Sequence, residues 1–218
     1  MKGRHGFTLI EMALVLVIIG IIIGMVLKGR SLIKTADAKK TATQVRQMET
    51  KVWEFFSRYH RFPGDCDGDR ISDAQVTNDK SGLDNTPDSG FCTSTTTDSD
   101  LDRAYAELKQ AKIIDVDDDN SNIAETSSGG VIYIGYATPD GGTEKYNAIA
   151  LAQITCLEAK TLDDIVDGKL DSGKGRVRVM TGAGTFSTTS DASSGPWNSV
   201  CPTEDTRISV VYLYDETP

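Results

Sequence analysis

The chain is poor in the residue types from which catalytic and metal centres are most often built. It has only two histidines, His5 and His60. This is too few for a multi-histidine metal site or for a histidine-based catalytic triad with evident context. No P-loop, dinucleotide-binding fingerprint or nucleophile elbow occurs either. These absences argue against an enzyme.

Basic residues are also in short supply. Lys and Arg together number 23 against 32 Asp and Glu, which gives a formal net charge of −9. Such a surface, taken as a whole, disfavours nucleic acid and anionic lipid. We therefore expect no nucleic-acid partner.

The chain has four cysteines, and none forms a C-x-x-C pair. They are Cys66, Cys92, Cys156 and Cys201. Wide spacing and scarce histidine disfavour zinc, whereas an even count in an exported domain indicates two disulfides. Of the three possible connectivities we predict the sequential one, Cys66–Cys92 and Cys156–Cys201. Each bond would then close an acidic, turn-rich loop that has too little apolar surface to order itself.

One long hydrophobic run dominates the N-terminal end. Residues 7–27 are apolar except for Thr8, Glu11 and two glycines, and about 20 such residues cross a bilayer as a helix. Glu11 is the anomaly, because a carboxylate inside a membrane span needs a partner. The run therefore predicts a transmembrane helix with one unexplained acid.

Basic residues before the run suggest its orientation. Lys2, Arg4 and His5 favour a cytoplasmic N-terminus, with everything after Leu27 outside. A secretory signal peptide is one alternative, but the run is longer than ~15 residues and no A-x-A-like cleavage site follows. A plain single-pass anchor is another, with Glu11 reaching the headgroups.

The segment Gly6-Phe7-Thr8-Leu9-Ile10-Glu11 resembles the class III signal of type IV pilins and type II secretion pseudopilins. The resemblance implies that residues 1–6 are a cytoplasmic leader, which a prepilin peptidase removes by cleaving between Gly6 and Phe7. It also implies N-methylation of the new amine on Phe7. Glu11 matches the acid that neutralises the N-terminal amine of a neighbouring subunit in these families.

Physical chemistry supports such a pair. An ammonium and a carboxylate are each costly in hydrocarbon, and close pairing removes most of that penalty. Phe7 and Glu11 stand at different levels of the helix, so pairing between copies demands an axial offset. A repeated head-to-tail offset gives an open helical filament. Many major pilins have a proline within the span, whereas this chain has none. We therefore expect any loosening of the helix at Gly20 and Gly24.

The helix is predicted to continue to Tyr59 as an amphipathic segment, residues 28–60. An apolar stripe at helical spacing comprises Ala38, Ala42, Val45, Met48, Val52, Phe55 and Tyr59. The turn at Phe62-Pro63-Gly64 should end it. The exported domain, residues 28–218, would pack this stripe against a sheet.

An acidic loop follows that turn. Asp65, Asp67, Asp69 and Asp73 alternate around a glycine, as oxygen ligands do in calcium loops. We predict a Ca²⁺ site with these side chains and the carbonyl of Ile71 as ligands. Asn78 or Asp79 would supply the last ligand, and a solvated acidic turn is the alternative interpretation. Asp115, Asp117 and Asp119 repeat the pattern more weakly.

The remaining sequence predicts an α+β domain with a small antiparallel sheet. Helices are expected at residues 101–113, capped by residues 98–100, and at 156–166. Strands are expected at 131–136, 146–154, 176–180 and 207–214, and exposed loops at 82–100 and 181–198. The stretch from Leu162 to Gly173 also resembles one seen in some pilin-like proteins.

The resemblance therefore implies a structural subunit of a type IV pilus-like filament. Its partners would be other copies of itself, other pilins, the prepilin peptidase, a filament ATPase and an inner-membrane platform protein. The subunit would wait in the bacterial inner membrane and end in a periplasmic or extracellular filament. One alternative is a pseudopilin of type II secretion, and another is a monomeric, membrane-tethered extracellular module that binds calcium or adheres.

Overall fold

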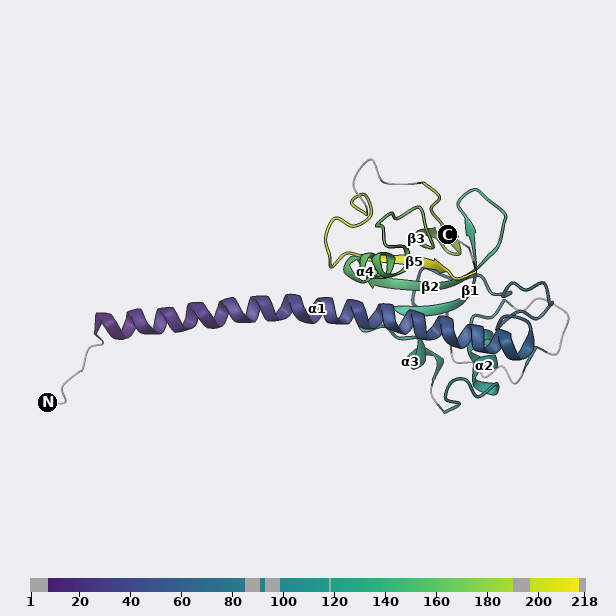
Figure 1. Cartoon of the computed structure of the whole chain (residues 1–218), viewed down its shortest axis with the longest axis horizontal. Helices are drawn as coiled ribbons and strands as arrows, with labels where there is room; N and C mark the ends of the chain where they lie inside the picture. Colours follow the sequence, from purple (N-terminus) through teal and green to yellow (C-terminus); the bar gives the residue numbers. More distant parts are fainter. Residues whose placement is uncertain (1–7, 85–90, 93–98, 118, 190–196, 216–218) are drawn as a thin grey trace. The chain divides into compact units, whose positions relative to one another are not determined.

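A computed structural model describes residues 8–84, 91–92, 99–117, 119–189 and 197–215. It divides into two compact units, Met1–Ala36 and Asp37–Pro218, and each is described by itself. The helices are α1 (Leu9–Tyr59), α2 (Asp102–Gln110), α3 (Asn120–Ala124) and α4 (Cys156–Asp167) (Figure 1). The strands are β1 (Val131–Pro139), β2 (Tyr146–Thr155), β3 (Val177–Gly182), β4 (Thr185–Phe186) and β5 (Arg207–Leu213).

The long N-terminal helix is confirmed. Helix α1 continues through Gly20 and Gly24 without a break, because helical hydrogen bonding needs no side chain at either position. It ends at Tyr59, where His60 takes a left-handed conformation with φ of 58°. Pro63 follows three residues later, so the helix stops at the predicted turn.

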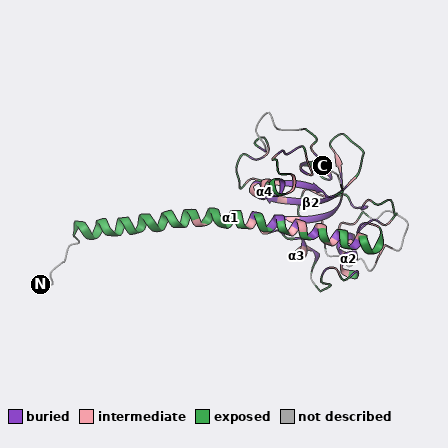
Figure 2. Cartoon of the chain, in the orientation of Figure 1, coloured by how far each residue is buried: buried purple, intermediate pink, exposed green. Residues whose placement is uncertain are grey.

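The part of α1 that belongs to the second unit buries a single stripe. Its buried residues are Ala38, Thr41, Ala42, Val45, Met48, Val52 and Phe55 (Figure 2). Tyr59, the last member of the predicted stripe, is instead 40% exposed. The stripe packs into the same apolar core as Ile132, Ile149 and Tyr212 of the sheet. The predicted combination of amphipathic helix and sheet is thus confirmed.

The strands form a closed barrel in the order β1-β2-β5-β3-β4. The pairs β1–β2, β2–β5 and β3–β5 are antiparallel, as predicted for the sheet, and β3 also pairs antiparallel with β4, a strand that was not predicted. The closing pair, β1–β4, is parallel and joins Thr138 and Pro139 to Thr185 and Phe186. The α+β class is confirmed, and the closure of the sheet is a feature that strand patterns alone did not predict.

Both faces of the sheet are covered. On β5, Val210 and Tyr212 face the core that includes α1, whereas Val211 and Leu213 belong to a second apolar cluster. This alternation follows from the two-residue period of a strand. Because both sets are buried, the strands read as continuous apolar runs.

The expectation of an exposed loop at residues 181–198 is wrong where the stretch enters the sheet and at Trp197, although residues 188–189 and 198 are exposed and lie outside the strands. Residues 181–182 end β3, residues 185–186 form β4, and the side chains of Phe186 and Trp197 are fully buried. The Ser, Thr and Gly content of this stretch concealed two aromatic residues that the core needs.

Candidate functional sites

The first site is the N-terminal end of α1. Thr8 donates a hydrogen bond from its backbone N–H and another from Oγ1 to Oε2 of Glu11, at 2.7 and 2.8 Å. The backbone N–H of Glu11 donates in return to Thr8 Oγ1 at 3.3 Å. This reciprocal arrangement is a capping box, for which the Thr-x-x-Glu spacing is typical. Glu11 therefore has a role within its own chain that the sequence analysis missed. Gly6 and Phe7 lie outside the described residues.

The helix that this cap begins presents a continuous apolar surface. Exposed fractions are 93% for Leu9, 67% for Leu16 and 67% for Met25, and the large apolar side chains between them are exposed too. By length and composition, α1 is the one helix in the described chain able to cross a membrane. Water is a poor environment for so large an apolar surface, which needs lipid or other apolar helices around it.

The second site is the acidic loop that follows α1. One carboxylate oxygen from each of Asp65, Asp67 and Asp69 lies within 4.8 Å of the other two. Asp65 is fully buried, and its carboxylate accepts backbone N–H bonds from Gly68 and Arg70 at 2.7 and 3.0 Å. Burial, the largest effect, raises the pKa of Asp65. The predicted ligands at positions 65, 67 and 69 are thus brought together.

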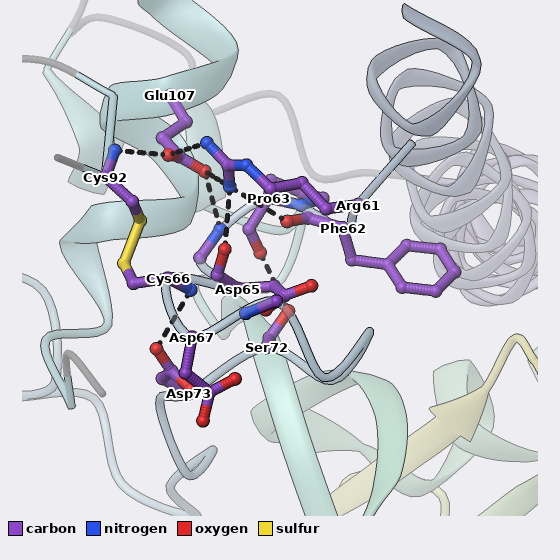
Figure 3. The surroundings of a disulfide bond; sticks show 12 residues. Arg61, Phe62, Pro63, Asp65, Cys66, Asp67, Ser72, Asp73, Cys92 and Glu107 are labelled. Carbon is purple, nitrogen blue, oxygen red and sulfur yellow. Dashed lines mark hydrogen bonds and ion pairs between the residues drawn. A yellow bond between two sulfur atoms is a disulfide. The ribbon is translucent and has the colours of Figure 1, made fainter. Parts of the chain in front are cut away.

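The other predicted ligands have different neighbours. Asp73 is not part of this group; its Oδ2 accepts the backbone N–H of Cys66 at 3.0 Å (Figure 3). The backbone N–H of Ile71 donates to Asp69 Oδ1 at 2.8 Å. Asp115, Asp117 and Asp119 do not form a comparable group. Three carboxylate oxygens at this separation suit a hard cation such as Ca²⁺, and calcium binding stays a prediction.

An ion pair between half-buried Arg61 and buried Glu107 holds the acidic loop against α2. Glu107 of α2 is fully buried and accepts two hydrogen bonds from Arg61, at 2.5 and 2.8 Å. The same carboxylate accepts the backbone N–H groups of Gly64 and Cys92, each at 2.8 Å (Figure 3). One side chain thus joins α2 to the start of the acidic loop and to its disulfide.

The structure pairs Cys66 with Cys92 and Cys156 with Cys201, which are the two pairs predicted. The second bond links α4 to the turn at residues 197–200. Within that turn the backbone N–H of Cys201 donates to the carbonyl of Trp197 at 2.8 Å. A disulfide and a backbone bond therefore act on the same few residues.

The same turn has a second attachment to α4 that the sequence analysis missed. Trp197 donates its indole N–H to Oδ2 of Asp163, which also accepts the backbone N–H of Asp171 at 2.9 Å. Oδ1 of Asp163 is buried and accepts no hydrogen bond from the described residues. Burial first, and then the nearby carboxylate of Asp167, raise the pKa of Asp163 to about 7. Asp163 lies seven residues after Cys156, or about two helical turns, so both side chains lie on the same face of α4. This spacing could have indicated from the sequence that Asp163 faces the segment attached to Cys156.

Comparison with protein-family models matches residues 1–27 to the prokaryotic N-terminal methylation motif. This motif is the class III signal of type IV pilins and pseudopilins, so the resemblance seen between Gly6 and Glu11 is confirmed. The motif and the apolar helix together indicate a membrane-anchored precursor that carries this N-terminal signal. A comparison with the curated proteins gave no match.

Proposed function

We propose that this pilin- or pseudopilin-type precursor is a structural subunit of a type IV pilus-like filament. The observation that carries the proposal is the exposed apolar surface of residues 9–27, headed by the capped acid Glu11. A bilayer is a favourable environment for the apolar side chains but not for the charged carboxylate of Glu11. The N-terminal amine of a neighbouring copy, freed by cleavage after Gly6, satisfies the charge as well.

The proposed pair also sets the geometry of assembly. Phe7 and Glu11 are four residues apart, or about 6 Å along the helix axis. Pairing Phe7 of one copy with Glu11 of the next repeats this offset at every step, and a repeated head-to-tail offset builds an open filament. The apolar helices then pack around the filament axis with no lipid between them.

Assembly of such a filament requires other proteins, which the resemblance to type IV pilins implies. A prepilin peptidase removes residues 1–6 and methylates Phe7, and an ATPase with an inner-membrane platform drives the subunit out of the membrane. The subunit passes from the inner membrane to a periplasmic or extracellular filament. Other pilins would join it there.

A pseudopilin of type II secretion is the second candidate. The converging carboxylates of Asp65, Asp67 and Asp69 suit a calcium-stabilised globular unit, which is compatible with this candidate. A membrane-tethered module that stays monomeric is the candidate from another class, and it needs neither leader cleavage nor the Glu11 charge.

The capping box makes a sharp test possible. Glu11→Gln removes the charge but keeps an oxygen that accepts from Thr8, because Gln serves at this position of a capping box. Thr8→Val removes the capping hydroxyl and keeps the charge. We expect Glu11→Gln to insert in the membrane at the wild-type level and to lose filaments in electron micrographs, while Thr8→Val still assembles. Normal filaments from Glu11→Gln would exclude the pairing role.

A further inference from the structure

A short basic segment follows the apolar run directly. Lys28, Arg30 and Lys34 fall within seven residues, and all three side chains are exposed. The leader has only two Lys and Arg residues, Lys2 and Arg4. Short outward-facing flanks of membrane spans are normally poor in Lys and Arg. In the orientation of the proposed function, this flank therefore carries an excess of positive charge that requires explanation.

The length of the span places the basic segment at a definite depth. Residues 9–27 form 19 residues of helix, about 28 Å at 1.5 Å per residue, which is close to the thickness of the hydrocarbon layer. Lys28 then lies at the edge of the hydrocarbon. Arg30 and Lys34 lie within roughly 10 Å beyond it, where phospholipid headgroups are found.

Two apolar neighbours distinguish this segment from an ordinary solvated helix face. Leu32 and Ile33 are 65% and 62% exposed, between Arg30 and Lys34. Exposed large apolar side chains interleaved with basic ones are typical of helices at a lipid interface, where alkyl groups enter the acyl boundary and cations meet headgroups. An acidic protein surface would pair with the cations but leave Leu32 and Ile33 in water.

We propose that the segment defined by Lys28, Arg30 and Lys34 is a binding site for anionic phospholipid headgroups. The inference rests on the proposed function for its location at the outer surface of the inner membrane. The acidic net charge of the whole chain does not oppose it, because exposed charges interact over about a Debye length, roughly 8–10 Å. Held there, the subunit is fixed at one depth in the bilayer before assembly.

The test measures lipid preference in the full chain, purified in detergent and offered equal amounts of phosphatidylglycerol and phosphatidylcholine. Native mass spectrometry counts each lipid bound. We expect phosphatidylglycerol to be preferred, and the triple variant K28Q/R30Q/K34Q to lose roughly tenfold or more of that preference. The control K112Q/K169Q/K174Q removes three exposed lysines from the second unit and should keep it. Lys2 and Arg4 are present in every variant, so they do not alter the comparison.

Two results would overturn the proposal. One is equal binding of the two lipids by the wild-type chain, and the other is an unchanged preference in K28Q/R30Q/K34Q. If that variant keeps its lipid preference but no longer forms filaments, the basic segment contacts the acidic surface of a second copy instead. Lipid binding in detergent requires neither cleavage nor polymerisation, so its failure leaves the filament proposal intact, and failed assembly leaves the lipid result intact. Circular dichroism checks that α1 is helical in each variant.

Discussion

The indole N–H of Trp197 donates to Oδ2 of Asp163 at 2.7 Å, and both side chains are fully buried. This bond fixes the turn before Cys201 to the inner face of α4. Trp197→Phe removes the donor and part of the buried ring, leaving the carboxylate with fewer partners. We expect a loss of about 2–4 kcal/mol in the free energy of unfolding, measured by urea denaturation. Trp53→Phe, at a tryptophan that is 40% exposed, is the control and should lose less than about 1 kcal/mol. Equal losses would show that the bond contributes nothing specific.

Asp163 also predicts how stability depends on pH. Its folded-state pKa, about 7, lies above the ordinary value of 3.8, so the folded state holds the proton more tightly than the unfolded state. The contribution of Asp163 to the free energy of unfolding is therefore fully favourable below pH ~4. It falls as the pH rises toward 7 and is constant above that. Burial raises the pKa of Asp65, Asp102 and Asp215 in the same direction.

The variant Asp163→Asn isolates the part of the pH dependence of stability that is due to Asp163. The amide keeps an oxygen for Trp197 and Asp171, and adds a donor toward Asp167. As the pH rises from 5 to 8, we expect the free energy of unfolding of the variant to increase by on the order of 1–3 kcal/mol relative to that of the wild type. Denaturation curves at the two pH values measure the gain. Asp164→Asn removes a charge from the exposed side of the same helix and is the control. An identical pH slope in wild type and Asp163→Asn would refute the assignment.

The ion pair between Arg61 and Glu107 should be essential for the acidic loop. Glu107→Ala leaves the N–H groups of Gly64 and Cys92 without their acceptor, and leaves the Arg61 guanidinium without its carboxylate partner. We expect it to lower the free energy of unfolding by about 3–5 kcal/mol. Glu54→Ala breaks the exposed pair with Arg58 and should cost less than about 1 kcal/mol. Similar effects from both, in chemical denaturation, would contradict the structural role of Glu107.

Calcium binding is tested by thermal melting of the full chain with CaCl₂ and with chelator. A ligand that binds only the folded state raises the midpoint, so we expect a higher midpoint in calcium. D67N/D69N should lose this shift, whereas D115N/D117N, which removes two charges from the other acidic loop, should retain it. A midpoint indifferent to calcium would exclude the site.

Local patterns predicted the elements of this fold better than their long-range partners. The stripe from Ala38 to Phe55 repeats at helical spacing, and the strands are rich in β-branched residues, so both were found. Phe186 and Trp197 were missed because the Ser-, Thr- and Gly-rich sequence around them is typical of loops. Their burial depends on β4 closing the barrel and on α4 supplying Asp163, which no local pattern records.

The candidate sites divide in the same way. Thr8 and Glu11 are three residues apart, so their spacing alone identifies a capping box. Glu107 was missed because an acid on a short helix usually faces solvent, and only the tertiary structure places Arg61, Gly64 and Cys92 around it. Residues far apart in the sequence thus hold the acidic loop that a local pattern had identified.

Mass spectrometry of the N-terminus of the native protein tests whether the chain is a processed filament subunit. We expect polymers whose chains begin at N-methylated Phe7, with residues 1–6 absent. Isolated molecules that retain Met1 to Gly6 would contradict it and would leave a membrane-tethered monomer.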